Sequence, residues 1–463
     1  MTTLTKPVSP ARSGHVLAPV LILVFAMAIV AMAFFALAGH ETRASQTNLD
    51  SQRAFWLAEE GRARALRDLS DPDLWPRPPE AETRLFTDEP GAALPGLVHR
   101  GSYTVDVVVD TLGAYAVEKQ FMVESVGTYA GRTRRVSQRI KMTSFAQYAY
   151  FTDEDTNPAG NPIWFITGDR IEGRVHSNGT FRISGNPAFL GRVTSASDHM
   201  IGDPSYWVDE PADWPCGSNH PTFAEGFELD IPEIPLPTNT LDLRSMGIHG
   251  GIYLGNPVDI EIGWRGETGP PIQQAGWLRY RTTGSSGNWT ERQISTIGTR
   301  VLYCQHDARI KGVLDGELTI ADHENIWIID DLTYQASDVS GAPLPGCNDL
   351  LGLVAENNIV FADLLPQTYD LKVNAVKMAR DTSIYAQNWD NGVLRGILTI
   401  WGGLIQQNRG AVGTHSGGTI NSGYRKNYHY DTRVTARTPP GYPLTGVYEQ
   451  VTWMETWDES YPF

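Results

Sequence analysis

The chain has 463 residues and a formal net charge of −16, and 41% of its residues are hydrophobic. This composition excludes a disordered chain, and the strong negative charge argues against nucleic-acid binding by the molecule as a whole. The length is too great for one compact core and indicates two domains beyond the N-terminal segment.

The first feature along the chain is an uncharged apolar run at residues 16–38. As a helix it would be roughly 35 Å long, enough to cross a bilayer core of about 30 Å. Its proline, Pro19, would lie in the first turn, where a missing N–H costs least. Lys6 and Arg12 precede the run and no acidic residue does. The positive-inside rule therefore predicts a single-pass inner-membrane anchor with a cytoplasmic N-terminus and an exported body.

A cleavable secretory signal is the main alternative for this run. Such a signal has a shorter apolar core, of ~7–15 residues, followed by small residues at the cleavage site. The small residues Ala36 and Ala38 leave room for cleavage at the end of the run.

The residues before the run, Arg12-Ser13-Gly14-His15, resemble the leader of type IV pilin-like proteins. The resemblance implies that residues 1–14 are a leader and that a prepilin peptidase cuts after Gly14, which leaves His15 as the first mature residue. It also implies that the apolar helix first lies in the inner membrane and then packs in the core of a filament. The expected partners are other pilins and the pilus assembly machinery.

The membrane run continues into a predicted stem, so that residues 15–69 form one transmembrane and stem helix. Apolar residues recur at three- and four-residue steps from position 49 to position 69, which gives an apolar stripe. The segment AFWLAEEG at 54–61 resembles the signature of PilX-type minor pilins and pseudopilins. The alternative is an ordinary amphipathic helix packed on its own domain. The residues assigned to the filament-core helix are Val16, Pro19, Leu23, Phe34, Phe55 and Glu59.

Two residues depart from the pilin pattern. The family usually begins its mature chain with Phe or Met, where this chain has His15, and usually has Glu at the fifth mature position, where this chain has Pro19. That glutamate is thought to pair with the amine of a neighbouring subunit. Its absence favours a position at the filament tip over a repeated position in the shaft.

Residues 70–95 are rich in proline and predict a loop that leads into a small antiparallel sheet, the pilin-like head at 70–143. Residues 101–111 alternate with period two, and a strand at 121–126 is followed by a turn at 129–132 and a return strand at 136–142. The basic residues in this hairpin have two interpretations, a nucleic-acid patch or the solvated face of the hairpin, and the second is favoured.

Residues 144–463 contain short apolar bursts separated by Gly, Asn, Asp and Ser, which favours a parallel β-solenoid over a sandwich. A Pro-, Trp- and Gly-rich insertion interrupts this pattern at about 205–300, and the aromatic tail from Pro439 is expected to pack back as a cap. Residues 160–440 resemble a little-characterised family of large bacterial proteins associated with pili or the envelope. The predicted fold class is mainly β with one long N-terminal helix.

A β-helix scaffold also admits a polysaccharide lyase or hydrolase. Asp330 and Asp331 could supply a carboxylate pair, and His249, Arg425 and Asn427 could complete a pectinase-like set, but the order of these residues along the chain does not match that set. The chain shows no zinc motif, phosphate loop or nucleophile elbow, so no cofactor or metal is expected.

Of the three cysteines, Cys304 and Cys347 are the favoured pair for one disulfide, against the alternative that all three are free. The sequence as a whole predicts a non-enzymatic minor pilin-like subunit at the cell surface. It would display a β-rich domain for adhesion or for priming assembly. The alternative is an anchored or secreted β-helix protein that binds or cleaves polysaccharide.

Overall fold

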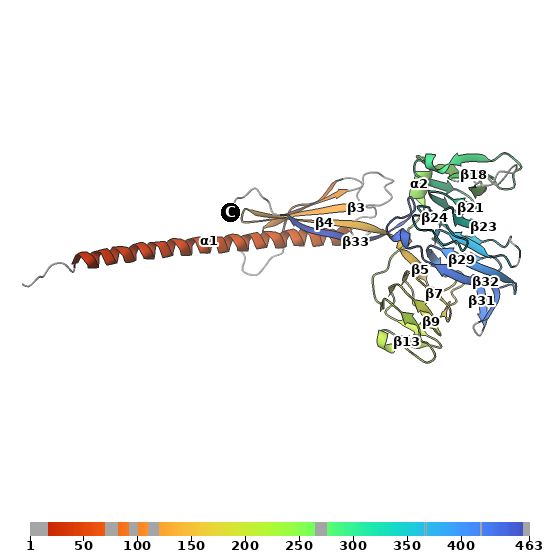
Figure 1. The fold of residues 1–463 in the computed structure, drawn as a ribbon, viewed down its shortest axis with the longest axis horizontal. Helices are drawn as coiled ribbons and strands as arrows, with labels where there is room; N and C mark the ends of the chain where they lie inside the picture. Colours follow the sequence, from red (N-terminus) through yellow and green to blue (C-terminus); the bar gives the residue numbers. More distant parts are fainter. Residues whose placement is uncertain are drawn as a thin grey trace, which may run out of the picture.

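The computed structural model describes residues 17–69, 82–91, 101–109, 120–263, 276–364, 366, 368–416 and 419–456. Figure 1 shows three parts in a row: a long helix, a small sheet along the second half of that helix, and a large β body beyond the end of the helix. The fold is mainly β, with parallel and antiparallel sheets and one long apolar helix at the N-terminus.

The long helix α1 (Leu17–Leu69) runs for 53 residues without a break. Its second half packs on the small sheet through a stripe of mostly small residues: Ala54, Leu57, Ala58, Gly61, Ala65 and Leu69. Because these side chains are short, the sheet comes very close to the helix. A Cβ on Gly127 of the sheet would lie 2.1 Å from the carbonyl oxygen of Ala54, so only glycine fits there.

The small sheet has five strands in the order β1-β2-β3-β4-β33, and all four neighbouring pairs are antiparallel. The strands are β1 (Thr83–Pro90), β2 (Ser102–Val109), β3 (Gln120–Tyr129), β4 (Arg132–Ser144) and β33 (Leu444–Thr456). The predicted turn is present: Ala130 and Gly131 have φ of 48° and 78°, as a two-residue hairpin loop of type I′ requires. Alternate residues of β2 and β3 are buried.

The fifth strand of this sheet comes from the far end of the chain. The tail was expected to pack back as a cap, whereas β33 pairs with β4 of the small sheet, from Leu444 opposite Ser144 to Thr456 opposite Arg135. The physical reason is that β4 needs a neighbour on its second side, and none of the described strands between residues 144 and 443 supplies one. The small sheet is therefore completed only after the whole body has been traversed.

The body contains two large sheets. The first has ten strands, and all its neighbouring pairs are parallel. In spatial order they are β15 (Phe227–Glu228), β11 (Val193–Ser195), β8 (Arg174–Ser177), β5 (Tyr148–Glu154), β30 (Leu404–Asn408), β27 (Val376–Ala379), β24 (Leu350–Ala355), β22 (Glu317–Asp322), β20 (Val301–Cys304) and β16 (Ile252–Leu254).

The second large sheet is parallel from β17 to β32 and has an antiparallel hairpin at each end. Its strands are β19 (Thr290–Gln293), β18 (Trp277–Thr282), β17 (Val258–Ile262), β21 (Ala308–Leu314), β23 (Ile326–Tyr334), β26 (Leu371–Asn374), β29 (Leu394–Trp401), β32 (Thr419–His429) and β31 (Gly413–Ser416), with β25 (Ile359–Phe361) and β28 (Ile384–Ala386) to the side.

The remaining elements are short. A four-stranded sheet contains β13 (Tyr206–Val208), β12 (Met200–Gly202), β9 (Arg182–Ser184) and β6 (Phe165–Ile166), and a three-stranded sheet contains β14 (Thr222–Phe223), β10 (Ala188–Phe189) and β7 (Arg170–Ile171). The short helices are the α-helix α2 (Leu241–Ile248) and the 3₁₀ turns η1 (Phe145–Gln147), η2 (Pro211–Asp213), η3 (Ile294–Thr296) and η4 (Thr432–Thr435).

The chain enters the body in the middle of the ten-stranded sheet, at β5. It builds outward in one direction through β8, β11 and β15, and we call residues 148–228 the first arm. It then crosses to the opposite end of the sheet, starts again at β16 and returns strand by strand to β30, which pairs with β5. We call residues 252–429 the second arm. In Figure 1, β9 and β13 of the first arm lie at the bottom of the body, and β18, β21 and β23 of the second arm lie at its top.

The second arm alternates between the two large sheets, and one apolar core fills the space between them. Residues of both sheets are buried in it, among them Ile320 and Leu353 from the first and Ile310 and Ile328 from the second. A second cluster covers the other face of the ten-stranded sheet, and a third lies between α1 and the small sheet. The molecule therefore has separate stem and body cores.

The predicted insertion at 205–300 contains ordered elements in its described residues. It includes the strands β13 to β19, the helix α2, and an extended segment at residues 229–240 that crosses between the two arms. We call this segment the strap. Its three prolines, Pro232, Pro235 and Pro237, explain why it makes no strand pairs, because proline has no N–H to donate.

Candidate functional site

The first functional surface is the N-terminal half of α1. Every residue from Leu17 to Gln46 is exposed, and the most apolar window has a mean hydropathy of 3.0 with none of it buried. Within the part of the chain that the structure describes, this is the one helix long and apolar enough to cross a membrane. Pro19, Leu23 and Phe34 all lie on it. Gly14, His15 and Val16 lie outside the described residues.

The second half of α1 is fixed to the small sheet by polar contacts as well as by packing. Glu59 accepts hydrogen bonds from Arg62, at 2.7 Å, and from the indole nitrogen of Trp453 on β33, at 2.8 Å. Phe55 is half-buried and makes an edge-to-face contact with Trp56. Glu59 therefore ties the stem helix to the last strand of the chain, a role that its local sequence could not indicate.

Some basic residues of the hairpin formed by β3 and β4 make contacts within the protein. Arg134 is buried, donates to the hydroxyl of Ser51 on α1 at 2.9 Å, and forms an ion pair with Glu455 on β33. Arg135 pairs with Glu124 on the neighbouring strand at 3.5 Å. Arg134 is therefore not on a solvated face, as was expected for this hairpin, but ties β4 to α1 and to β33.

The chain enters and leaves the body at one place, which we call the neck. Here the N–H of Phe145 and the hydroxyl of Ser144 both donate to the carbonyl of Pro443, each at 3.1 Å. Tyr430 donates from its hydroxyl to the carbonyl of Gln147 at 2.8 Å. Because β4 and β33 leave the neck side by side, two paired strands connect the body to the stem (Figure 1).

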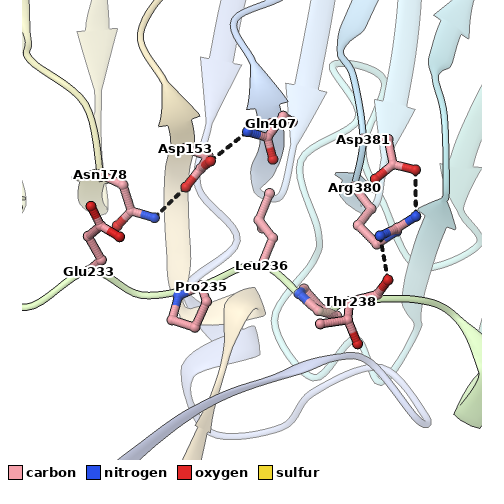
Figure 2. Close-up of a pocket in the computed structure, with 10 residues that line it drawn as sticks. Asp153, Asn178, Glu233, Pro235, Leu236, Thr238, Arg380, Asp381 and Gln407 are labelled. Atoms are coloured by element: carbon pink, nitrogen blue, oxygen red, sulfur yellow. Dashed lines mark hydrogen bonds and ion pairs between the residues drawn. The ribbon is translucent and has the colours of Figure 1, made fainter. Parts of the chain in front are cut away.

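A row of polar side chains follows the ends of the parallel strands in the ten-stranded sheet, because parallel strands end at the same edge. The strap covers part of this row and borders an open pocket of about 320 Å³. In Figure 2, Asp153 on β5 accepts from Asn178 and from Gln407, each at 2.5 Å. Asn178 also exchanges two hydrogen bonds with the main chain of Ile234 in the strap.

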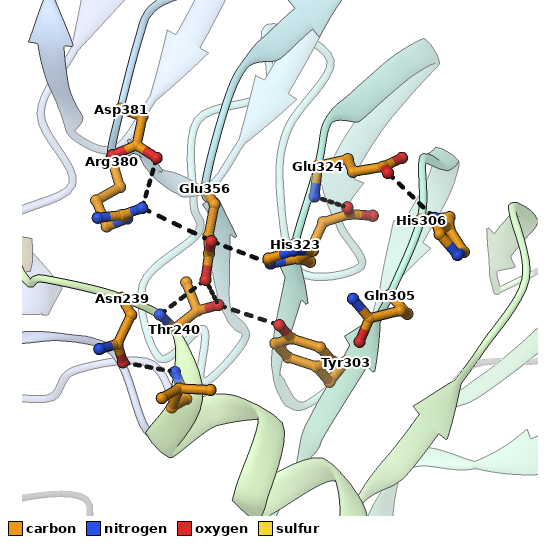
Figure 3. A network of polar contacts seen from close by, with 12 residues as sticks. Asn239, Thr240, Tyr303, Gln305, His306, His323, Glu324, Glu356, Arg380 and Asp381 are labelled. Carbon is orange, nitrogen blue, oxygen red and sulfur yellow. Dashed lines mark hydrogen bonds and ion pairs between the residues drawn. The ribbon is translucent and has the colours of Figure 1, made fainter.

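The C-terminal end of the strap is held by Glu356, which follows β24 (Figure 3). One carboxylate oxygen of Glu356 accepts from the N–H of Thr240 at 3.0 Å and from its hydroxyl at 2.5 Å, and the other lies 3.0 Å from His323. Burial alone would raise the pKa of Glu356, but these hydrogen bonds and the charges of His323 and Arg380 outweigh it, so the pKa is lowered. The carboxylate is thus held in its charged form.

A buried ion cluster joins the two arms where β30 meets β5. Arg409 of the second arm lies 3.6 Å from Asp155 of the first arm and stacks over the ring of Phe165 at 3.7 Å. Lys426 of the second arm pairs with Asp169 of the first at 2.9 Å. Burial raises the pKa of Asp155 to about 6 although Arg409 is near. The seam between the arms therefore combines strand pairing with buried charge.

Three residues of the pectinase-like set, Asp330, Asp331 and His249, form hydrogen bonds with main-chain atoms. Asp330 accepts from the N–H of Asp331 at 2.8 Å, and Asp331 accepts from the N–H of Lys372 at 2.8 Å. His249 lies at the C-terminal end of α2 and contacts the carbonyl of Ser245. Arg425 and Asn427 lie on β32, where Asn427 donates to Thr399. No hydrogen bond or ion pair among these described residues brings the set together.

The state of the three cysteines differs from the pairing that the sequence favoured. Cys216, Cys304 and Cys347 are all free thiols, so the disulfide predicted between Cys304 and Cys347 is not formed in this structure. Cys304 is fully buried in the core between the two large sheets, and the thiol of Cys347 lies 3.5 Å from the carboxylate of Asp349. Within the described ranges, no group of three or more His, Cys, Asp or Glu side chains is arranged to hold a metal ion.

Comparisons with known proteins give few relatives. A family model described as a domain of unknown function, DUF4900, matches residues 102–216, which run from β2 of the small sheet into the first arm. No curated protein matches the chain. Among solved structures, the chain is similar to the competence-associated pilin ComZ from Thermus thermophilus, with 15% identity, 88% of this chain and 97% of that chain covered, and a TM-score of 0.32.

Proposed function

We propose that this chain is a minor pilin-like structural subunit of a type IV pilus or a related secretion filament. The observation that carries the proposal is α1 itself. Its first half is apolar and fully exposed, and it continues without a break into a second half that packs on an antiparallel sheet. An exposed apolar surface of this size needs a membrane or other apolar helices around it.

The proposal includes the processing that the N-terminal residues indicate. The helix first spans the inner membrane, with Lys6 and Arg12 on the cytoplasmic side, and a prepilin peptidase removes the leader after Gly14. The PilX-type motif at 54–61 belongs to this proposal. After cleavage the helix enters the filament core beside other pilins, with the help of the assembly machinery, and the subunit reaches the cell surface.

The body is proposed to be a parallel β-solenoid displayed at the filament tip for adhesion or for priming assembly. The alternation of strands between two parallel sheets around one core supports the solenoid. The position of the body beyond the stem, at the end away from the apolar half of α1, supports display (Figure 1). Pro19 in place of the usual glutamate supports the tip. The role is structural and involves no catalytic turnover.

Replacement of Gly14 tests the proposal. We expect a Gly14→Leu variant to remain uncleaved in the membrane and to be absent from filaments sheared from the cells, while the wild-type chain is present in them. The matched control is Gly255→Leu, an exposed position where a Cβ meets nothing closer than 3.8 Å. Equal amounts of the Gly14→Leu variant and the wild type in the sheared fraction would contradict the proposal.

A further inference from the structure

The last strand, β33, is an edge of the small sheet. It pairs with β4 on one side, and no described strand pairs with its other side. Its exposed apolar side chains are unusual for such a position: Val447 is 43% exposed, Val451 49%, Trp453 48% and Met454 51%. An unpaired edge that carries apolar side chains is a template for another strand.

The two edges of the small sheet differ in a way that indicates which one is left open. The opposite edge, β1, is shorter, carries Arg84, Asp88 and Glu89, and ends at Pro90. Charges and proline are the usual means of protecting an edge from strand addition. From Gln450 to Met454, β33 has neither. The sheet is thus protected at β1 and open at β33.

The indole of Trp453 is also held in place before any partner arrives. Its nitrogen donates to Glu59 of α1, and Arg62 holds the same carboxylate from the next turn of the helix. A large apolar side chain that is already ordered loses little conformational entropy on binding. The edge therefore presents main-chain groups and a fixed aromatic ring to a partner.

The orientation of α1 limits what this partner is. If β33 of one copy paired antiparallel with β33 of a second copy about a two-fold axis, the two α1 helices would point in opposite directions and could not share a membrane. If copies stood side by side in the same orientation, β33 would face β1 of the next copy, because these two strands are the opposite edges of the sheet, and the two strands would run parallel. That edge is the charged one.

We propose that the outer edge of β33 binds a β-strand of a second, different protein anchored in the same membrane, so that the five-stranded sheet extends across two chains. This inference rests on the proposed function, because it takes the orientation of β33 from a membrane-anchored α1. The partner contributes an edge strand with apolar side chains, which cover Val451, Trp453 and Met454.

Site-specific crosslinking in the native cells tests the inference. A photoreactive benzophenone amino acid replaces Met454 in the full chain, and the same replacement at Val339, which is 93% exposed on the body, serves as the control. Crosslinked peptides are identified by mass spectrometry. We expect a peptide from a strand of a different chain that has its own N-terminal apolar helix. Crosslinks only to a second copy, or a yield no higher than at Val339, would overturn the inference.

A lysine on the open edge provides the second test. Val451→Lys adds a charge of the kind that blocks edge pairing, and we expect it to lower the Met454 crosslink about tenfold, equivalent to about 1.4 kcal/mol. Val339→Lys is the matched control and leaves the yield unchanged. Both positions are exposed, so both variants keep the wild-type melting temperature. An unchanged yield in Val451→Lys would overturn the inference.

Measuring the crosslink and the sheared filaments in the same cells distinguishes a failure of this inference from a failure of the proposed function. If the protein is present in sheared filaments but position 454 gives no specific crosslink, the edge inference fails and the filament role stands. If the expected crosslink forms in membranes while the sheared fraction lacks the protein, the edge inference stands and the filament role fails.

Discussion

At the scale of single residues, the closest approach in the stem occurs at Gly127. Its neighbours across the interface are main-chain atoms of α1, the carbonyl oxygen of Ala54 and the nitrogen of Ala58, which cannot move aside as a flexible side chain would. The packing of helix on sheet therefore depends on a residue without a side chain, and any added atom must separate the two elements.

A Gly127→Ala variant tests this interface. We expect the stem to lose about 1–3 kcal/mol of stability, because overpacking forces the backbone to shift. Urea denaturation followed by circular dichroism measures the loss. The matched control, Gly255→Ala, places the same methyl group in open space and should change stability by less than about 0.5 kcal/mol. Equal denaturation midpoints for the two variants would show that α1 does not pack on the sheet in this way.

A second prediction at this scale concerns the buried carboxyl group of Asp322 at the end of β22. Burial raises its pKa from 3.8 to about 9, although the N–H of Glu324 donates to it. Because the folded-state pKa exceeds the unfolded one, this group stabilises the fold below pH 3.8 and the contribution is lost as pH rises towards about 9.

Asp322→Asn should remove that dependence, since the amide oxygen can still accept from Glu324 and no charge forms. We expect the stability of the variant to fall less steeply with pH than that of the wild type between about pH 5 and pH 9. Denaturation midpoints at several pH values measure the two slopes. Asp330→Asn on β23 is the control and should follow the wild type. Parallel slopes for Asp322→Asn and the wild type would refute the assignment.

At the scale of elements, the strap is held at its middle and at its C-terminal end by side chains that follow strands of the ten-stranded sheet. Asn178 binds the main chain of Ile234 in the middle, and near the C-terminal end Arg380 donates to the carbonyl of Thr238 and Glu356 holds Thr240. The segment makes no strand pairs of its own, so these contacts replace a ladder of main-chain hydrogen bonds.

Glu356→Ala should release the strap. The N–H of Thr240 would lose its acceptor, at a cost of about 1–3 kcal/mol, while its hydroxyl would keep Tyr303 as a partner. We expect faster amide hydrogen exchange across residues 229–240, measured by mass spectrometry, and little change in the first arm. Glu324→Ala is the control, because the Glu324 side chain pairs with His306 outside the strap. Unchanged exchange in the strap of Glu356→Ala would contradict the role of Glu356.

Local elements of this chain could be predicted from its sequence, because their signals are local. The uncharged run before Gly39, the alternation in β2 and the Ala130-Gly131 turn each depend on a few consecutive residues. The partner of β4 could not be predicted, because β33 lies about 300 residues away and its pairing is decided by the path of the whole body. The contact of Glu59 with Trp453 was missed for the same reason.

The strap was described only as part of a loop-rich insertion, because proline-rich sequence shows where strands are absent and not what the chain binds. The pairing of Cys304 with Cys347 was a choice from position along the chain, and in this structure both residues are free thiols, with Cys304 in the core. The separation of two cysteines along the sequence says little about the distance between them in a body where strands far apart in the sequence lie side by side.

At the scale of the whole molecule, both connections of the body pass through the neck. The first arm begins there, the second arm ends there, and the buried contact of Arg409 with Asp155 closes the seam between them. A mechanical load on the body would pass through β4 and β33 together into the small sheet, and from the sheet into the long helix. The architecture suits a domain that is carried at the end of an anchored rod.

The most direct test of this account is the N-terminal sequence and intact mass of the protein recovered from membranes and from filaments sheared off the cell surface. The account predicts a mature chain that begins at His15, with α1 retained, in the sheared fraction. A chain cut near Ala38, or an uncut chain confined to the membrane, would contradict it, because in either case the apolar half of α1 would never enter a filament.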